Sequence, residues 1–239
     1  MIFGNPKVSI LLTSYNNKMV KDAIDSVFTQ TYKNWELIIL DDNSNKKTQN
    51  IYKPYLKDPR VIYYNSKVKE KDRLKVCPYA KNINVGLKMA TGKLIVYMCD
   101  DVVYLPSKLE KMVSFLKRHP RIKVCYNRQR MEIEGKRLKA FKKKNRVTPP
   151  SVIVLAPDRI LRDPFHRVDH NSVMHYKSCI NNVGDWETKS FSMADAYFWR
   201  KLGKKYPFYP IREILEVHHL HSESFSNKIA NKKLNIKST

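Results

Sequence analysis

Residues 93–101 read Lys93-Leu-Ile-Val-Tyr-Met-Cys-Asp-Asp101. The apolar run from Leu94 to Met98 predicts a buried strand. The two carboxylates at its carboxyl end would lie in the crevice where open α/β sheets bind ligands. Adjacent carboxylates repel each other and need a compensating charge, such as a divalent cation. On these residues alone, a solvated acidic turn is an equally good interpretation.

The first 120 residues repeat this alternation of strand and helix. Strands are predicted over 7–12, 35–40, 60–64 and 94–98, and helices over 20–28, 48–56, 79–90 and 107–119. Such alternation is typical of an α/β fold with a mostly parallel sheet and right-handed crossovers. Gly92 is expected to end the third helix in a left-handed conformation. Ser107 and Glu110 are expected to form a capping box on the fourth.

The second half has a different character. Short strands over 122–126 and 131–133 could pair, 152–155 is again apolar, and 194–202 has helical spacing. Residues 136–150 are basic and end in Thr148-Pro-Pro150, which indicates a loop. We therefore expect a first half over 1–120, a smaller mixed region of the same domain over 121–226, and a basic tail over 227–239 that is loosely ordered.

Composition limits the class of protein. The 239 residues are 42% hydrophobic and 11% aromatic, which is enough for a packed core. We see no apolar run of about 18–20 residues, as a membrane span requires, and no signal peptide. Four widely spaced cysteines suggest reduced thiols. These features predict a cytoplasmic protein, with peripheral contact to a membrane, a forming spore or a cell-surface layer left open.

The net charge of +24 predicts attraction to polyanions. A nucleic-acid-binding protein is therefore a competing hypothesis, which salt-sensitive binding to DNA or RNA would favour. We consider nucleic acid the weaker interpretation, because the chain has no recognisable binding motif and basic runs are most often solvated.

Three polar clusters follow three predicted strands: Thr13-Ser-Tyr15, Asp41-Asp42 and Asp100-Asp101. In a parallel sheet these strand ends lie at one edge and can meet at one ligand. The chain contains neither GxGxxG after the first strand nor GxxxxGK[ST], which argues against a dinucleotide cofactor and a P-loop. An acidic edge suits a metal-bound diphosphate, with another carboxylate accepting hydrogen bonds from a base or ribose.

A series of motifs in this order resembles the nucleotide-sugar-binding half of the family 2 glycosyltransferases. It comprises Val8-Ser-Ile-Leu-Leu-Thr-Ser-Tyr-Asn16, Ser26-Val-Phe-Thr-Gln-Thr-Tyr32, Glu36-Leu-Ile-Ile-Leu-Asp-Asp-Asn-Ser44, Ala90-Thr-Gly-Lys93 and Asp100-Asp101. The similarity extends through 169–175, 194–199 and 206–210 toward the enzymes of spore-coat polysaccharide synthesis in bacilli.

The resemblance implies a GT-A fold and inverting transfer of a sugar from a UDP- or dTDP-linked donor, assisted by Mg²⁺ or Mn²⁺. The acceptor would be a hydroxyl of a glycan, glycolipid or glycoprotein, and an anionic acceptor would suit the basic chain. Residues 1–120 would bind the nucleotide sugar, and 121–226 would supply the acceptor site and the base. A silent family member that binds nucleotide sugar without turnover is an alternative, which retained UDP binding without turnover would favour.

The resemblance also assigns roles around the nucleotide. Thr13 and Tyr15 would lie against the base, and Asp42 would accept its imide N–H, whereas Asp41 is expected to be structural. Arg73 would contact the base or a phosphate, although it stands among lysines and could simply be solvated.

Other roles concern the chemistry. Asp100 would approach the ribose or sugar, and Asp101 would be the main metal ligand. Asp195 would be the general base, although a helix amino end also favours an acid. His221 would lie near the diphosphate or metal, and a surface cluster of His218 and His221 is the alternative. Three further residues would lie on the acceptor side or be buried polar groups: Asp169, His170 and His175.

Overall fold

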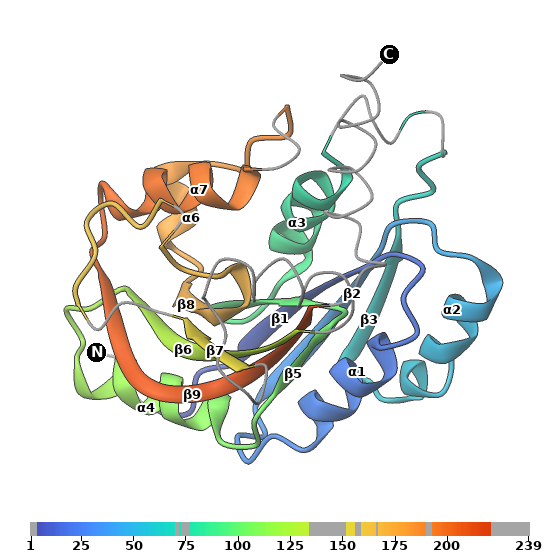
Figure 1. Ribbon diagram of the computed structural model, residues 1–239, viewed down its shortest axis with the longest axis horizontal. Coiled ribbons are helices and arrows are strands. Elements are labelled where there is room, and N and C mark those ends of the chain that lie inside the picture. Colours follow the sequence, from blue (N-terminus) through green and yellow to red (C-terminus); the bar gives the residue numbers. More distant parts are fainter. Residues whose placement is uncertain are drawn as a thin grey trace.

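One sheet organises the molecule. The computed structural model describes residues 4–69, 72, 77–133, 152–155, 159–165, 167–189 and 193–220. Within them the strand order is β3-β2-β1-β4-β8-β6-β9-β5, with β7 paired to β6 (Figure 1). Strands from before and after residue 120 pair in this one sheet, so the two expected halves share it. The boundaries at 120 and 226 remain predictions, and the tail at 227–239 lies outside the described residues.

The first half contains the predicted parallel strands. These are β1 (Val8–Ser14), β2 (Trp35–Asp41), β3 (Val61–Asn65) and β4 (Leu94–Cys99). All three pairings among them are parallel, and Ser14 is level with Asp41 while Thr13 is level with Cys99. The carboxyl ends of β1, β2 and β4 therefore meet at one edge, as the sequence predicts.

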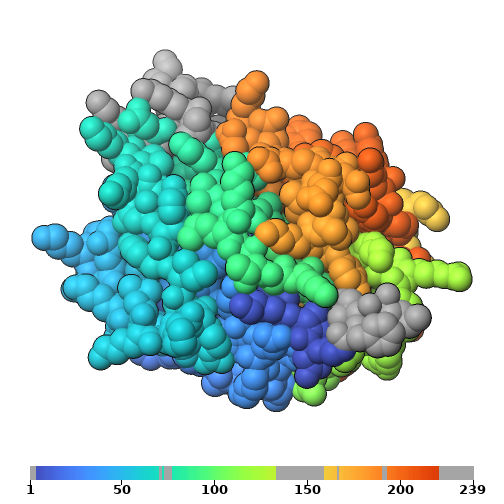
Figure 2. Space-filling view, turned by 180° about the vertical axis from the view of Figure 1, so that it is seen from behind, coloured from blue at the N-terminus to red at the C-terminus, as the bar shows by residue number. Residues whose placement is uncertain are grey.

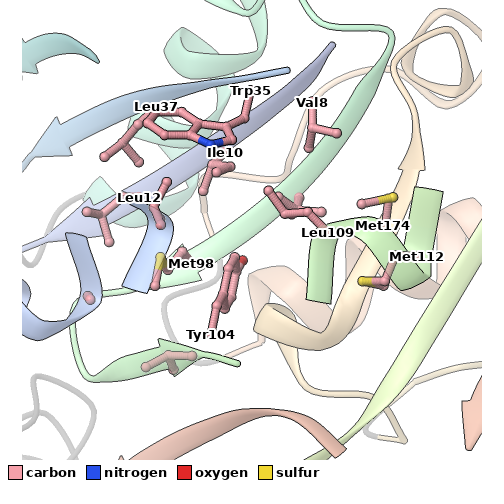
Figure 3. Close-up of a cluster of buried hydrophobic side chains, with 14 of the residues drawn as sticks. Val8, Ile10, Leu12, Trp35, Leu37, Met98, Tyr104, Leu109, Met112 and Met174 are labelled. Carbon is pink, nitrogen blue, oxygen red and sulfur yellow. The ribbon is translucent and has the colours of Figure 1, made fainter. Parts of the chain in front are cut away.

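Both faces of β1, β2 and β4 are buried, which explains their continuous apolar sequences. On one face, Ile10 and Leu12 pack with residues of α1 (Val20–Phe28) and α4 (Lys108–Arg118) (Figure 3). On the other face, Leu11 and Tyr97 pack with residues of α3 (Pro78–Met89) and α7 (Ala194–Gly203). Among the residues that the structure describes, the other helical segments with stated bounds are α2 (Lys46–Tyr52), η1 (Tyr55–Lys57), η3 (His170–Ser172) and α6 (Cys179–Val183).

The first half also contains β5 (Val102–Tyr104), and the second half adds β6 (Val124–Ile133), β7 (Val152–Leu155), β8 (Val173–Tyr176) and β9 (Phe208–Leu220). The expected pair of strands within 122–133 is wrong: β6 is continuous and pairs instead with β7, β8 and β9. The longest strand, β9, was not predicted. Seen from behind, α3 in green lies between cyan residues of the first half and orange residues of the second (Figure 2). No helix in the described ranges has the length and apolar character to cross a bilayer.

Gly92 is required for a reason other than the expected one. Positive φ values occur among the described glycines only at Gly4 and Gly184, so the expected left-handed conformation of Gly92 is wrong. A Cβ at Gly92 would instead lie 2.6 Å from Ser9 Oγ and 2.7 Å from the Lys7 carbonyl oxygen. Close packing of the turn against β1 therefore excludes a larger side chain.

The expected capping box on α4 does not form. The Ser107 side chain makes no capping hydrogen bond, and Glu110 accepts a hydrogen bond from Thr31 Oγ1 at 2.6 Å. The amide of Leu109 donates instead to Gln30 Oε1 at 3.1 Å. The residue just beyond α1 thus supplies the acceptor that the local sequence assigned to Ser107.

Candidate functional site

Asp100 ties the end of β4 to the loop after β1. Its Oδ2 accepts hydrogen bonds from Ser14 Oγ at 2.8 Å and the Tyr15 amide at 2.9 Å, and its Oδ1 accepts one from Asn17 Nδ2 at 3.0 Å. Burial and the neighbouring charge of Asp101 nevertheless raise the pKa of Asp100 to about 7. The described contacts make Asp100 an anchor of the loop, and its role toward ribose or sugar stays a prediction.

The loops after β1 and β2 are tied to each other. Asn16 and Asn43 both have left-handed backbones, with φ values of 52° and 55°, which asparagine tolerates better than most residues. The Asn16 amide donates to Ser44 Oγ at 2.9 Å, and Asn16 Oδ1 accepts from the Asn45 amide at 2.7 Å. These bonds fix the two loops that carry the predicted base-binding residues.

The two acids after β2 have different environments. Asp41 is fully buried and accepts hydrogen bonds from Tyr63 OH at 2.8 Å and the Ser44 amide at 3.1 Å, which fits the expected structural role. Asp42 Oδ1 accepts a hydrogen bond from Ser66 Oγ at 2.9 Å. Asp42 therefore stands at the carboxyl edge of the sheet, and its contact with a base remains a prediction.

The first two predicted base contacts, Thr13 and Tyr15, lie near the end of β1 and in the loop that Asp100 anchors. Thr13 Oγ1 is 3.5 Å from the Met98 carbonyl oxygen, so Thr13 faces the end of β4. Tyr15 is partly buried. Arg73 lies outside the described residues. Stacking of a base on Tyr15 stays a prediction.

His218 joins two carboxylates from different parts of the chain. Its Nε2 is 3.3 Å from Asp101 Oδ1, and its Nδ1 is 3.7 Å from Asp169 Oδ2. Burial opposes a charge on His218, but hydrogen bonding and the charges of Asp101 and Asp169 outweigh it and raise its pKa to about 10. Burial would raise the pKa of Asp169, yet His218 and Asn171 hold it below its ordinary value. The pairing therefore favours a charged imidazole between two carboxylates.

This geometry corrects one sequence interpretation. The His218 side chain is only 13% exposed, so the alternative of a surface cluster is wrong for this residue. Its register opposite Val102, directly after Asp101, places it at the acidic pair. His221, the predicted metal neighbour, lies outside the described residues. Recognising His218 would have required predicting β9 and its pairing with β5.

Asp169 and His170 are adjacent but face different surroundings. Asp169 belongs to the acid cluster around His218. His170 Nδ1 is 2.7 Å from Tyr79 OH, and its ring packs among Tyr97, Trp186 and other aromatic rings. Burial lowers the pKa of His170 to about 3, so the ring is neutral. These contacts fit the interpretation of a buried polar group for His170, and an acceptor-side role for either residue stays a prediction.

His175 has a buried position. Its Nε2 is 2.7 Å from Tyr97 OH, and its Nδ1 is 2.8 Å from the Tyr176 carbonyl oxygen. Both ring nitrogens thus have partners within the core, which fits the interpretation of a satisfied buried group.

Asp195 lies in the first turn of α7 and is partly exposed. Burial is the main cause of the raised pKa of Tyr79 and of Cys77, and the charge of Asp195 adds to both. The charge of Asp42 also acts on Cys77. The role of Asp195 as the base therefore stays a prediction.

The donor types around His218 fit a divalent cation. Carboxylate oxygens suit Mg²⁺ and Mn²⁺, and imidazole is a common ligand of divalent transition metals. Among the residues that the structure describes, no group of three or more His, Cys, Asp or Glu is arranged as a metal cage. Mg²⁺ commonly binds through one or two carboxylates together with substrate phosphates. Asp101 and His218 thus offer donors of a suitable kind for a site that a diphosphate completes.

Comparisons with known proteins show the family of the chain. Residues 9–183 match the glycosyl transferase family 2. The chain is 37% identical over 229 residues to protein CgeD of Bacillus subtilis, covering 92% of this chain and 52% of the relative. It is 35% identical over 117 residues to the putative glycosyltransferase EpsE of the same organism, covering 48% of this chain and 40% of EpsE. The chain therefore spans about half the length of these relatives or less.

Solved structures share the architecture. S. aureus TarS in complex with UDP-GlcNAc has a TM-score of 0.70 at 15% identity, over 92% of this chain and 60% of TarS 1–349. The mannosyltransferase PcManGT of Pyrobaculum calidifontis, in complex with GDP-Man and Mn²⁺, has a TM-score of 0.66 at 15% identity, over 93% of this chain and 59% of its own. These similarities confirm the predicted GT-A fold. With the family match over most of its length, the chain belongs to glycosyltransferase family 2.

Proposed function

We propose that this protein transfers a sugar from a nucleoside-diphosphate sugar to a hydroxyl acceptor, with inversion at the anomeric carbon. The observation that carries the proposal is the convergence of Asp101, His218 and Asp169 at the sheet edge where Asp100 anchors the loop after β1. In a family 2 glycosyltransferase, this edge is where a diphosphate and its cation would be held.

The nucleoside would bind between the loops that follow β1 and β2. Thr13 and Tyr15 would contact the base, Asp42 would accept its imide N–H, and Arg73 would contact the base or a phosphate. We propose a UDP- or dTDP-linked donor, because an imide N–H is what a carboxylate acceptor at Asp42 would select. The bonds between Asn16 and Ser44 and between Asn45 and Asn16 support this role by fixing the two loops relative to each other.

Asp101 would hold Mg²⁺ or Mn²⁺, and His218 would join it as a ligand once its imidazole has lost the proton that it carries between the two carboxylates. When bound, the cation would neutralise charge on the departing nucleoside diphosphate. His221 remains a further predicted ligand. Asp100 supports Asp101 by fixing the β4 end and, as predicted, would approach the ribose or sugar.

Asp195 would act as the general base. Its carboxylate would take the proton from the acceptor hydroxyl while that oxygen forms a bond to the anomeric carbon. Attack from the face opposite the diphosphate breaks the bond to the leaving phosphate oxygen and inverts the configuration. The partial exposure of Asp195 would let an acceptor reach it.

The acceptor would be a hydroxyl of a glycan, glycolipid or glycoprotein. The charge of +24 would favour an anionic acceptor or a peripheral position on an anionic surface. Asp169 and His170 are weaker candidates for the acceptor side, because their described contacts are with His218 and Tyr79.

Calorimetry tests the proposal. UDP, dTDP and GDP are titrated into the unaltered protein with Mn²⁺ and again with EDTA, and product formation is measured with the corresponding nucleotide sugars. We expect tighter binding with Mn²⁺ for at least one diphosphate, and turnover that Asp195→Asn removes without weakening that binding. Salt-sensitive binding to nucleic acid with no nucleotide binding would contradict the proposal. Binding without turnover, across acceptors, would favour the silent family member.

A further inference from the structure

A buried ion pair joins α4 to β9, the strand that carries His218. The side chains of Lys108 and Glu216 are both 0% exposed, and Lys108 Nζ bonds to Glu216 Oε2. Replacing a buried ion pair with apolar residues is often neutral or stabilising. Stability alone therefore gives a weak reason for a lysine at this position, and its other contacts become informative.

The ammonium of Lys108 connects three segments. Besides Glu216 on β9, it donates to Asn127 Oδ1 on β6 and to the Asn171 carbonyl oxygen in η3, both at 2.9 Å. All three ammonium hydrogens thus have an acceptor. Glu216 Oε1 in turn accepts a hydrogen bond from Gln129 Nε2 at 3.0 Å.

Asn171 carries this connection to the acids of the site. Its Nδ2 donates to Asp169 Oδ1 at 2.6 Å, and its Oδ1 accepts from the Cys99 amide at 2.7 Å. Cys99 directly precedes Asp100 and Asp101. One residue held by Lys108 therefore fixes both Asp169 and the end of β4.

Glu216 links the Lys108 ammonium to β9, the strand that also carries His218. The two residues are two positions apart on β9, so their side chains leave the same face of the strand. They lie opposite Tyr104 and Val102 of β5, and opposite Gln129 and Met131 of β6. The β6–β9 register is irregular between Asn127 and Gln129, and irregularities of this kind redirect side chains next to active sites. Holding Glu216 just beyond it would set where His218 points.

We propose that Lys108, paired with Glu216, is a positioning residue that sets the spacing of Asp101, Asp169 and His218, and through it the affinity of the site for a diphosphate with its divalent cation. The inference rests on the proposed function. Lys108 touches neither substrate nor cation in this account and acts through Asn171 and Glu216.

The chain offers a matched control on the same two elements. Lys111 on α4 and Glu213 on β9 also form an ion pair, but their side chains are 41% and 52% exposed. Lys108→Met/Glu216→Gln and Lys111→Met/Glu213→Gln therefore make the same chemical change, once inside the network and once outside it. Asn171→Asp keeps the acceptor for the Cys99 amide and removes the side-chain donor to Asp169, which retains from residue 171 only the backbone amide at 2.9 Å. It therefore weakens the network at a second point.

Calorimetry measures the ratio of diphosphate affinity with Mn²⁺ to that in EDTA, using whichever of UDP, dTDP and GDP binds the unaltered protein best. Thermal unfolding checks that each variant is folded. We expect the Lys108/Glu216 variant to lose about 10-fold or more of this ratio, with its affinity in EDTA unchanged, and the Lys111/Glu213 variant to keep the ratio of the unaltered protein.

A folded Lys108/Glu216 variant that keeps the ratio would overturn the inference. If that variant does not fold, Asn171→Asp decides: a similar loss supports the inference, and an unchanged ratio overturns it. If the unaltered protein binds no diphosphate with Mn²⁺, the proposed function itself is wrong, which is a separate outcome.

Discussion

Two acidic side chains, the buried Glu36 and the half-buried Asp100, lie at opposite ends of the parallel strands and have different environments. At the amino-terminal edge, Glu36 accepts hydrogen bonds from Ser9 Oγ, Thr91 N and Thr91 Oγ1 at 2.6–2.7 Å, and from Gly92 N at 3.1 Å. Burial raises the pKa of Glu36, but these bonds outweigh it and hold the pKa below its ordinary value. At the carboxyl edge, Asp100 also has several donors, yet burial and Asp101 raise its pKa to about 7.

The difference separates structure from function within one family motif series. Glu36 accepts the hydrogen bonds that Thr91 and Gly92 of the Ala90-Thr-Gly-Lys93 segment donate, so this part of the motif series supports the fold. Asp100 and Asp101 place two like charges side by side, and the hydrogen bonds to Asp100 do not offset burial and this repulsion. Asp101 has His218 at 3.3 Å, whose charge a bound divalent cation would replace. Variants at each edge can separate a loss of stability at Glu36 from a loss of ligand binding at Asp100 and Asp101.

The largest expected effect concerns turnover. Asp195→Asn should lower the rate of sugar transfer by about 10²–10⁴-fold, because the acceptor hydroxyl loses its base. Nucleotide affinity and thermal stability should remain those of the unaltered protein. Steady-state assays with calorimetry check this, and a variant that retains full turnover would show that another group is the base.

The next effect concerns stability at the amino-terminal edge. Glu36→Ala leaves the Thr91 amide and the Ser9 hydroxyl without their acceptor, whereas the Gly92 amide keeps Ser9 Oγ at 2.8 Å. The change should lower the free energy of unfolding by about 2–4 kcal/mol. Urea denaturation measures the loss. The metal-dependent part of nucleotide binding should survive in the folded protein, and its loss would mean that the two edges are not independent.

A smaller loss of stability is expected at Gly92. In Gly92→Ala the new methyl group would meet Ser9 Oγ and the Lys7 carbonyl at distances too short for contact, so the turn must shift, at a cost of about 1–3 kcal/mol. The matched change Gly184→Ala adds a methyl group in open space, but at a φ of 71°, so its cost would come from backbone strain alone. Comparing urea midpoints separates the two causes, and an undiminished midpoint for Gly92→Ala would contradict the packing argument.

The smallest effect is a pH dependence of opposite sign at the two edges. Because the pKa of folded Glu36 is lowered, its contribution to stability is present above its unfolded value of 4.5 and is lost as the pH falls below that value. Asp100 has a raised pKa, so its ionisation costs stability as the pH rises from 3.8 toward about 7.

Unfolding free energies measured without metal between pH 3 and 8 test these signs. The Glu36→Gln variant should lose part of the stability increase seen near pH 4. The Asp100→Asn variant should lose part of the decline between pH 4 and 7. Identical pH profiles in both variants and the unaltered protein would contradict the contrast.

The sequence predicted the edge of the sheet but not everything that reaches it. Asp42, Asp100 and Asp101 directly follow apolar strands, so the parallel topology brought them together. His218 and Lys108 escaped prediction for a physical reason. His218 itself and Glu216, the partner of Lys108, both lie on β9. The sequence of β9 contains Pro210, Arg212 and Glu213 and lacks clean alternation. A buried lysine on an otherwise amphipathic helix also looks solvated until its partner is placed.

The cap of α4 is a second feature for which tertiary contacts differ from what the local sequence predicts. Ser107 and Glu110 have the spacing of a capping box, but tertiary contacts from Gln30 and Thr31 provide the hydrogen bonds instead. Local spacing predicts where a helix begins more reliably than it predicts which side chain caps it. Arg73 and His221 remain predictions from the family resemblance.

The most direct test of the central claim compares Asp101→Asn with Glu36→Gln in diphosphate binding. Calorimetry with the best-binding nucleoside diphosphate, with Mn²⁺ and in EDTA, gives the metal-dependent part of the affinity for each protein. We predict that Asp101→Asn loses about 10-fold or more of that part, while Glu36→Gln is destabilised but keeps it. Unchanged metal-dependent affinity in Asp101→Asn would contradict the assignment of the carboxyl edge as the diphosphate and cation site.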